Sequence, residues 1–401
     1  MRLHLIKLKN KCCCISIGRE LSFSFRELKK QVEAARETLC RRGPFLCASV
    51  DEPVEEVQPV DADRSEDDTN YDRSNLCYNI EPVSRIDFPY VDLAKPLHRA
   101  EKHLFRYFLD GSIRTYYWGE KIEGNKGFPV MVAEVASAVI HREDDGKVRV
   151  AGFKRKLGLL TPPSPPLSDD TWQDVLHLKE SFEHLELSPK LEVVPLAKAE
   201  EKADLRTSLA GKARSVMHDL EHELAVGLPR DAEKWLVIDG SIRKELFLHI
   251  DNTIGLAKSF SRKPVFSINN SRGVKDVVSM LSRLPDGHRT AVFKQTVTPE
   301  LAGDSVKKSI AFWYLRLRSG RGLQSPLQGI VKVELCHKSE ELAKEQLEEV
   351  DMISRALLAE KYVSPYPTPR WHAHIYPIFV AENYIKSSLY STVYIRGLLI
   401  G

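Results

Sequence analysis

The pattern of apolar and polar residues divides the first part of the chain into a helix and a linker. Residues 19–42 carry apolar residues such as Leu28 and Val32 at helical spacing, with Lys and Glu between them, which predicts an amphipathic helix. Residues 50–76 are acidic, contain prolines and have almost no apolar periodicity, which is typical of a linker or a solvated loop. We therefore expect residues 1–80 to form a helical and disordered N-terminal extension.

Strand patterns dominate residues 84–160. Three segments are rich in apolar and aromatic residues, and an Asp-Asp-Gly turn signal separates the second from the third, which predicts an antiparallel sheet. The sequence TPPSPPLSDD at 161–170 is a Pro-rich insertion that should end the sheet, because proline lacks the N–H group that a ladder needs. Residues 170–228 then read as helical.

The remaining sequence alternates between short apolar strands and helices. In the segment KWLVIDGS at 234–241, the residues WLVI before the Asp-Gly-Ser end are all apolar, as expected of a buried central strand. A long helix with apolar residues on one side is predicted at 339–362. Strands followed by alternating β and α segments predict an α/β fold in which helices flank a mixed sheet. We expect this domain to cover residues 81–401.

Composition narrows the class of protein. The 401 residues include 59 Lys and Arg against 56 Asp and Glu, for a net charge of +3. This near balance argues against a uniformly basic nucleic-acid-binding surface, so any such binding must be local. No apolar run reaches the roughly 20 residues that a bilayer span needs. We expect a soluble, cytoplasmic protein that does not associate with membranes.

Two apolar strands that run into Asp-Gly-Ser are the strongest chemical signal. Asp110 follows RYFL and Asp239 follows LVI. Aspartate is disfavoured inside strands, and a carboxylate beside buried apolar residues needs a compensating cation or donors. Two carboxylates at neighbouring strand ends would form a site for Mg²⁺ or Mn²⁺, which activates water and binds phosphate. The alternative is that each Asp-Gly is an ordinary turn.

A second candidate is the cluster YPTPRWHAH near the C-terminus. His372 and His374 alternate, so both would point the same way in a strand and would diverge in a helix. A histidine beside Tyr and Trp is as often a packed, hydrogen-bonded side chain as a metal ligand, and both interpretations stay open.

Basic residues follow the second Asp-Gly-Ser. In GLAKSFSRK, Lys258, Arg262 and Lys263 could bind a phosphate backbone. Arg316 and Arg318, which share one face of a predicted strand, raise the same question. The alternative for each group is a solvated basic surface.

In their order and spacing these elements resemble the NurA nuclease family. The resemblance rests on the two Asp-Gly-Ser strands, the lysine in a G-x-x-K-S loop and the late YP…AH element, and it covers roughly residues 100–401. It implies an RNase H-like core, a homodimer and a requirement for divalent metal, usually Mn²⁺. It also implies action with a HerA-type hexameric ATPase in DNA end resection and double-strand break repair, through 5′→3′ exonuclease and single-strand endonuclease activity.

The resemblance also implies roles for individual residues. Asp110 and Asp239 match the metal-binding carboxylates, and His374 matches the active-site histidine, which would ligate a metal or move a proton. Tyr366 matches the family's tyrosine, and Lys258 matches the basic residue after the second strand.

The family also has a glutamate on the helix before the second Asp strand. Glu221 and Glu223 both lie at about the right distance in MHDLEHELA, and we choose Glu221 as the third metal-binding carboxylate. The choice is ambiguous because the following loop can shift the register.

The sequence therefore predicts a metal-dependent DNA nuclease with Mn²⁺ or Mg²⁺ as cofactor. The alternative is a non-catalytic RNase H-like module that binds DNA and docks on a ring ATPase, which the ambiguous glutamate and the near-neutral charge favour. The helix at 19–42 and the apolar C-terminal segment are the expected dimer contacts.

Overall fold

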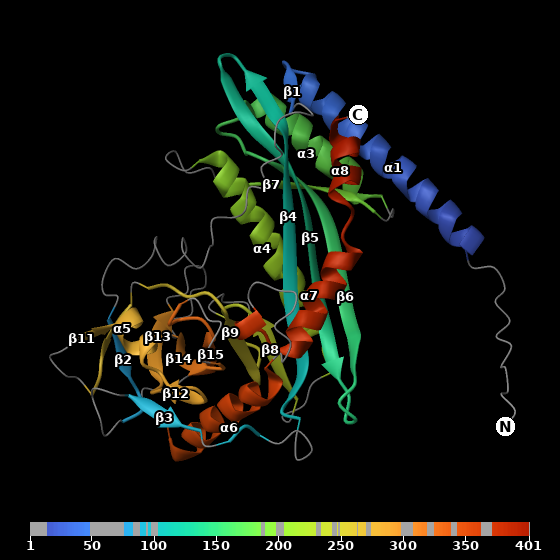
Figure 1. Cartoon of the computed structure of the whole chain (residues 1–401). Helices are drawn as coiled ribbons and strands as arrows, with labels where there is room; N and C mark the ends of the chain where they lie inside the picture. The colour runs from blue at the N-terminus through green and yellow to red at the C-terminus, as the bar shows by residue number, and fades with distance from the viewer. Residues whose placement is uncertain are drawn as a thin grey trace, which may run out of the picture.

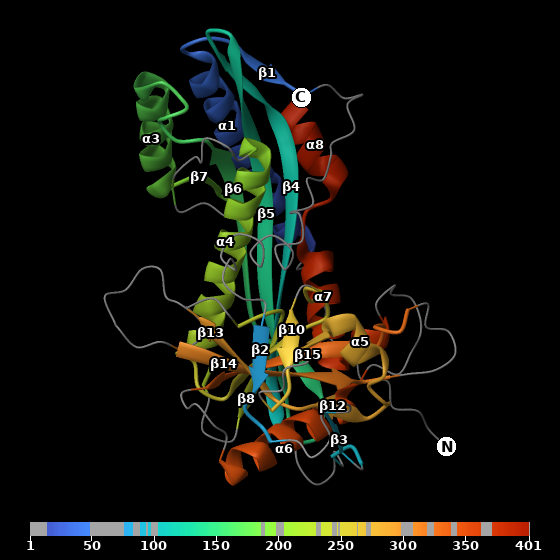
Figure 2. The same ribbon diagram turned by 90° about the vertical axis from the view of Figure 1, so that its left-hand side faces the viewer.

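Three long antiparallel strands rise well beyond a body of shorter strands and helices (Figures 1 and 2). The long strands are β4 (Phe105–Glu123), β5 (Lys126–Arg142) and β6 (Val148–Thr161). They confirm the antiparallel sheet predicted from the strand pattern. The computed structural model describes residues 14–48, 76–82, 89–93, 95–97, 103–185, 189–197, 204–229, 234–242, 247, 249–262, 264–269, 274–297, 308–318, 325–337, 343–361 and 371–400.

Two short strands continue the sheet from β4 in the parallel sense. They are β8 (Trp235–Asp239) and β9 (Thr253–Ala257), which give the local order β6-β5-β4-β8-β9. β8 is parallel to both of its neighbours and is buried almost throughout. This confirms the central strand predicted at 234–241, because only a strand covered on both faces is apolar along nearly its whole length.

The other strands extend the same sheet into one large mixed sheet. Most of them belong to the body below the long strands (Figure 2). They are β1 (Phe45–Cys47), β2 (Leu76–Asn79), β3 (Tyr90–Asp92), β7 (Leu191–Pro195), β10 (Val265–Ser267), β11 (Val274–Asp276), β12 (His288–Thr290), β13 (Phe293–Val297), β14 (Lys308–Arg316) and β15 (Ile330–His337).

β7 corrects the helical interpretation of residues 170–228. The segment LEVVP pairs in parallel with the end of β6, with Leu191 opposite Leu157. Its apolar and β-branched residues suit a sheet, but the run is too short to stand out between two helices.

Helices flank the sheet, which confirms the predicted α/β class. None of the described helices is long and apolar enough to cross a lipid bilayer. The helical elements are α1 (Cys14–Cys40), α3 (Asp169–Glu183), α4 (Leu205–Val226), α5 (Val277–Ser282), α6 (Lys344–Glu360), the 3₁₀ turn η2 (Trp371–Ala373), α7 (Tyr376–Ser388) and α8 (Thr392–Ile400).

The helices α4 and α7 cover opposite faces of the long strands (Figures 1 and 2). Leu109 of β4 and Ile238 of β8 pack in one cluster with Ala225 of α4. Phe108 of β4 shares another cluster with Ala381 of α7. Since successive side chains of a strand point to opposite faces, odd-numbered positions of β4 from Tyr107 onward face α4 and even-numbered ones face α7. In β8 the numbering is reversed, so that Ile238 faces α4 and Val237 faces α7.

The predicted N-terminal helix is present and packs into the core of the same chain. Leu28 and Val32 of α1 are buried in one cluster with Ile395 and Leu399 of α8. The helix at 19–42, expected as a dimer contact, thus buries apolar residues within the chain, and the apolar C-terminal segment does the same through Ile378 and Ala381 of α7.

Residues on the N-terminal side of position 80 also belong to the sheet. β1 pairs with β4, and β2 pairs with β10 and β13. The domain boundary at residue 80 stays a prediction. The acidic linker lies mostly outside the described residues.

Candidate functional site

The two aspartates of the Asp-Gly-Ser elements meet on neighbouring strands. The parallel pairing of β4 with β8 ends with Leu109 opposite Ile238, so Asp110 and Asp239 are the next positions in register. Both aspartates lie on the α7 face of the sheet. Phe108 and Val237 stand two residues earlier on their strands and belong to the cluster on that face, and side chains two residues apart in a strand point the same way. The two carboxylates therefore leave the sheet side by side.

The first Asp-Gly-Ser corrects the expectation that it closes a strand. β4 continues to Glu123, and Asp110 pairs with Ala138 of β5 in a ladder that keeps its register from Tyr107 to Tyr117. β8, by contrast, ends at Asp239. Asp110 thus lies inside a strand, at the level where β4 loses its parallel neighbour, and this opening makes room for a polar side chain.

The second Asp-Gly-Ser does turn the chain, and its turn is firmly held. Gly240 has a φ of +124°, a conformation that suits glycine. A Cβ on Gly255 would lie 2.8 Å from the Gly240 carbonyl oxygen, so only glycine allows this approach. The buried carboxylate of Glu334 accepts hydrogen bonds from the Ser241 hydroxyl at 2.6 Å and the Ile242 amide at 3.1 Å. Asp239 is therefore followed by a fixed loop.

Lys258 and His374 lie next to the two aspartates. Lys258 directly follows β9, and its Nζ donates to Oδ2 of Asp239 at 2.7 Å. The same Nζ lies 3.3 Å from Nδ1 of His374, a buried residue between η2 and α7. The structure thus brings together four residues that are far apart in the sequence. They are predicted site residues, although Lys258 contacts a carboxylate rather than standing open toward a phosphate.

Glu382 of α7 joins this group, and sequence reasoning missed it. Its Oε2 lies 3.8 Å from Nδ1 of His374, and its Oε1 accepts from Lys386 at 2.5 Å. In the sequence, Glu382 and Lys386 look like an ordinary surface pair four residues apart on a helix. We call Asp110, Asp239, Lys258, His374 and Glu382 together the β4–β8 site.

Negative charge outweighs positive charge around Asp110. Burial and then the charge of Asp239 raise the pKa of Asp110 well above its usual value, Lys258 opposes this, and Glu221 and Glu382 add to it. For Glu382, burial raises the pKa, but Lys386, Lys258 and His374 outweigh burial and lower it. The site therefore holds one acid that is costly to ionise beside one that is readily ionised.

Glu221, chosen from the sequence over Glu223 as a metal-binding carboxylate, is buried on α4. A Cβ on Gly111 would lie 2.7 Å from Oε1 of Glu221, so this carboxylate approaches β4 at Gly111. Gly111 is an odd-numbered position, and Asp110 points to the other face. Glu221 also binds Nδ1 of His218 at 2.7 Å. It therefore lies near Asp110 but across the strand from the β4–β8 site.

Other predicted residues fall elsewhere. Glu223 is exposed on α4 and pairs with Lys154. Arg262 is exposed and His372 is half-buried on η2. Tyr366 and Lys263 lie outside the described residues.

Arg316 corrects the idea of a basic phosphate-binding strand. Its guanidinium is buried and donates to the carbonyl oxygens of Leu281 at 2.9 Å and Pro326 at 2.8 Å. Burial lowers the pKa of Arg316. An arginine enclosed by main-chain carbonyls ties loops together and cannot also bind a nucleic acid.

The donor set of the β4–β8 site fits a divalent cation in its chemistry. Carboxylate oxygens are the ligands that Mg²⁺ and Mn²⁺ prefer, and imidazole is compatible with Mn²⁺. Among the described residues, however, no group of three or more His, Cys, Asp or Glu side chains is arranged to hold one ion. Instead, the Lys258 ammonium provides the positive charge beside Asp239.

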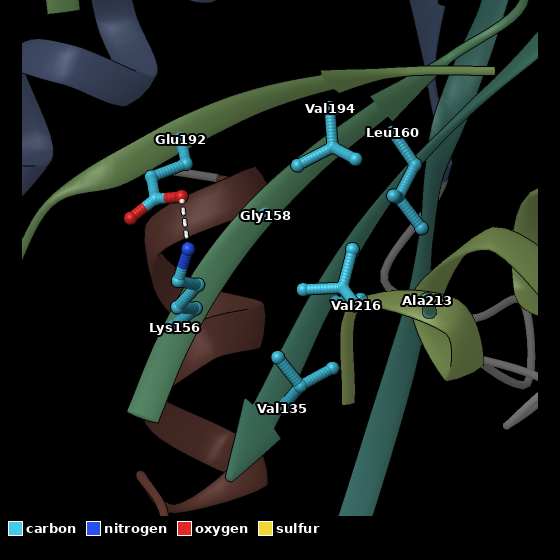
Figure 3. Close-up of a pocket in the computed structure, with 9 residues that line it drawn as sticks. Val135, Lys156, Gly158, Leu160, Glu192, Val194, Ala213 and Val216 are labelled. Atoms are coloured by element: carbon cyan, nitrogen blue, oxygen red, sulfur yellow. Dashed lines mark ion pairs between the residues drawn. The ribbon is translucent and has the colours of Figure 1, made fainter. Parts of the chain in front are cut away.

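A pocket on the α4 face is a poor alternative site (Figure 3). It lies between α4 and strands β5, β6 and β7 and leaves a cavity of only about 10 Å³. Apart from an ion pair between Lys156 and Glu192 at 3.2 Å, its lining is apolar. No catalytic side chain converges on it, so the β4–β8 site is the better candidate.

Comparison with known proteins adds no assignment. No protein-family model matches the chain, and no curated protein matches its sequence. The function must therefore be argued from the β4–β8 site itself.

Proposed function

We propose that this chain is a divalent-metal-dependent deoxyribonuclease with an RNase H-like core. The observation that carries the proposal is the adjacent placement of Asp110 and Asp239 on one face of the sheet, in register at the end of the β4–β8 ladder. Lys258 and His374 stand beside them. Two carboxylates with a lysine and a histidine are suited to cleaving phosphodiester bonds.

The strand order supports the RNase H-like part of the proposal. Three antiparallel strands, β6, β5 and β4, are followed by β8 and β9, both in the parallel sense to β4. This is the arrangement that we expect of an RNase H-like core, with acidic residues on its first and fourth strands. The same resemblance to NurA nucleases suggests DNA as substrate, a HerA-type ATPase as partner and a homodimer.

The residues of the site have separate tasks in this proposal. Asp110 and Asp239 would hold a Mn²⁺ or Mg²⁺ ion, which would supply Lewis-acid chemistry toward the phosphate and toward water. Lys258 faces the same space and stabilises negative charge that develops on the phosphate. His374 holds or moves a proton at an imidazole nitrogen. The fixed loop after Asp239 keeps that carboxylate in place.

The test is a cleavage assay on end-labelled single- and double-stranded DNA with Mn²⁺, Mg²⁺ or EDTA. Asp239→Asn should lower the cleavage rate by about 100-fold or more, because losing a ligand costs at least as much as losing its support. Asp286→Asn is the matched control, since Asp286 is exposed in a loop away from the site. A folded Asp239→Asn protein that cleaves at the wild-type rate would refute the proposal.

A second candidate function is a non-catalytic module that binds DNA and docks on a ring ATPase. The observation that favours it is the ion pair between Lys258 and Asp239, in which a lysine already neutralises the carboxylate. Manganese separates the two candidates. A nuclease is stabilised by Mn²⁺ through mass action, whereas the module binds DNA without Mn²⁺ and shows no cleavage.

A further inference from the structure

We infer that Cys40 and Cys47 form a thiol pair that a small soluble disulfide, such as glutathione disulfide, oxidises reversibly to a disulfide bond. The bond would tie the end of α1 to β1 at the outer end of the long strands. The pair is separate from the β4–β8 site. Cys47 lies opposite Gly119 of β4, which is about 30 Å along the strand from Asp110 at the usual rise per residue.

The turn that carries the two cysteines is fixed to β4. α1 ends at Cys40 and β1 ends at Cys47, so the cysteines stand at the two ends of this turn. Figure 1 shows the end of α1 beside β1, and the two elements are in contact. Nζ of Lys121 donates to the carbonyl oxygen of Gly43 at 3.0 Å. Gly43 has a φ of +126°, which suits glycine, so the chain is held in a tight turn from helix to strand.

The direction of β1 places the Cys47 side chain on the side that α1 covers. Phe45 of β1 packs in one cluster with Leu39 of α1. Cys47 is two residues after Phe45, so its side chain points to the same side of the strand. Leu46, between them, points away and is 58% exposed. Cys47 therefore faces the last turn of α1, which ends at Cys40.

The electrostatics of this junction agree with thiols that are near each other. Burial is the largest effect on Cys47 and raises the pKa of its thiol, the Arg36 guanidinium opposes burial, and the Cys40 thiol adds to it. Arg36 lies about one helical turn before Cys40. Cys40 also acts on Lys121, whose pKa is lowered chiefly by burial. The thiol pair thus stands beside two cationic side chains, the kind of surroundings in which cysteines react with disulfides.

Both thiols are free and exposed, so a soluble oxidant reaches them. In the first step the Cys40 thiolate attacks one sulfur of glutathione disulfide, and one glutathione leaves as its thiolate. In the second step the Cys47 thiolate attacks the Cys40 sulfur, and the second glutathione leaves. The two protons of the protein thiols end on the two glutathione thiolates, and two electrons pass from the cysteines to glutathione.

The experiment incubates the reduced full chain with glutathione disulfide, alkylates the remaining thiols and maps tryptic peptides by mass spectrometry. Cleavage at the arginines places the two cysteines on separate peptides, residues 37–41 and 43–64. The disulfide between these peptides should form about 10-fold faster in the folded chain than in the chain unfolded in urea, because the fold holds the thiols together. Dithiothreitol should remove it.

Two variants test the assignment of the pair. Cys47→Ser should abolish the linked peptides. Cys336→Ser is the matched control, because it removes a half-buried cysteine of β15 and should leave them unchanged. Circular dichroism shows whether each variant is folded, and Cys40→Ser, at the end of a helix, provides the same comparison if Cys47→Ser is not.

The outcomes are independent of nuclease activity, so this inference and the proposed function can each fail without the other. A folded wild type in which Cys40 remains a free thiol would overturn the inference. So would a Cys40 that pairs with a cysteine other than Cys47, or equal rates in the folded and unfolded chains.

Discussion

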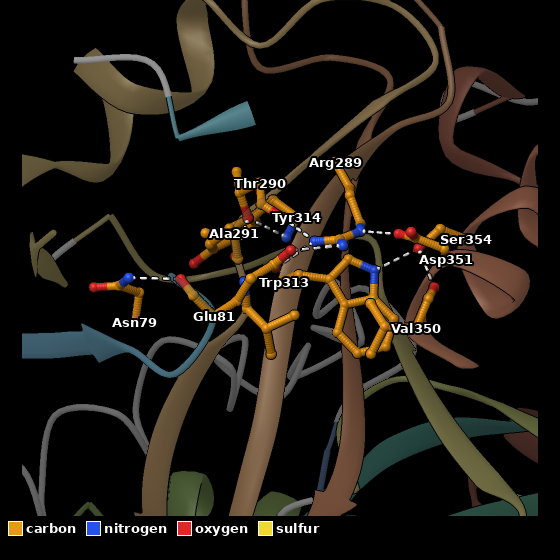
Figure 4. A network of polar contacts seen from close by, with 11 residues as sticks. Asn79, Glu81, Arg289, Thr290, Ala291, Trp313, Tyr314, Val350, Asp351 and Ser354 are labelled. Carbon is orange, nitrogen blue, oxygen red and sulfur yellow. Dashed lines mark hydrogen bonds and ion pairs between the residues drawn. The ribbon is translucent and has the colours of Figure 1, made fainter. Parts of the chain in front are cut away.

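Two of the groups of buried charges on this sheet differ in how well the acids are matched by cations. In the first, Arg289 of β12 binds Glu81 through Nη1 at 2.6 Å and Nη2 at 2.9 Å, and binds Asp351 of α6 through Nε at 2.6 Å (Figure 4). Glu81 accepts a further hydrogen bond from the Val292 amide at 3.0 Å. We call these residues the Arg289 network.

In the β4–β8 site the acids are not matched in this way. Asp110 accepts a hydrogen bond from the amide of Gly111 at 2.9 Å. The one lysine near both aspartates, Lys258, contacts the carboxylate of Asp239.

The difference between the two groups appears in the pKa values. Burial lowers the pKa of Arg289, but Glu81 and Asp351 outweigh it and raise it, whereas burial and Asp239 both act against ionised Asp110.

The comparison separates buried charges that the fold itself satisfies from acids that the fold leaves poorly matched. The Arg289 guanidinium donates to two carboxylates and to the carbonyl oxygen of Thr290, and these acceptors stabilise its ionised form. A surplus of buried acid at the end of the β4–β8 ladder leaves unfavourable free energy in the folded protein.

Breaking the matched group should have the largest effect on stability. Arg289→Met leaves Glu81 and Asp351 buried or half-buried without their shared cation, so the free energy of unfolding should fall by about 3–5 kcal/mol. Urea denaturation monitored by circular dichroism measures it. Arg262→Met, on an exposed arginine, should change it by less than about 0.5 kcal/mol. Equal effects of the two substitutions would contradict the structural role of the network.

Removing the lysine of the β4–β8 site should lower the free energy of unfolding by a smaller amount, which depends on whether Asp110 is present. Lys258→Met leaves Asp110 and Asp239 side by side, and we expect a loss of about 1–3 kcal/mol at pH 8. Adding Asp110→Asn to Lys258→Met should recover part of this loss, because one of the two repelling charges is gone. A double-mutant cycle by urea denaturation measures the coupling. Strict additivity would show that the two groups do not interact.

Removing the surplus acid alone should stabilise the protein. Because the folded-state pKa of Asp110 is raised above the unfolded value of about 3.9, the folded state binds the extra proton, and wild-type stability falls as pH rises through the folded-state pKa. Asp110→Asn should therefore raise the free energy of unfolding at pH 8 by about 0.5–2 kcal/mol, while abolishing cleavage. The gain should shrink toward pH 4, where wild type and Asp110→Asn both carry a neutral side chain at position 110 in the folded state. A loss of stability at pH 8 would mean that Lys258 stabilises ionised Asp110 more than burial opposes it.

Much of the architecture was accessible from the sequence. The strand patterns before residue 161 and the apolar run LVI before Asp239 predicted long antiparallel strands and a buried central strand, because burial on one or two faces dictates the periodicity. The short strand β7 was missed because five residues between helices carry too little periodicity to be recognised. The buried role of Arg316 was also missed, since a basic residue in a strand gives no sign of the carbonyl oxygens that will enclose it.

By itself, the sequence singled out the candidate site residues one by one. An aspartate after an apolar run is unusual enough to be noticed for Asp110 and Asp239, Lys258 stood out by its position after the second Asp-Gly-Ser, and His374 stood out in the cluster YPTPRWHAH. Only the tertiary structure decided how these residues are grouped. Register placed the two aspartates side by side, and the alternation of β4 put Glu382 on their face and Glu221 on the other. That choice depends on how α4 and α7 pack on opposite sides of one strand, which is a relation between residues more than 100 positions apart along the chain and leaves no trace in local sequence.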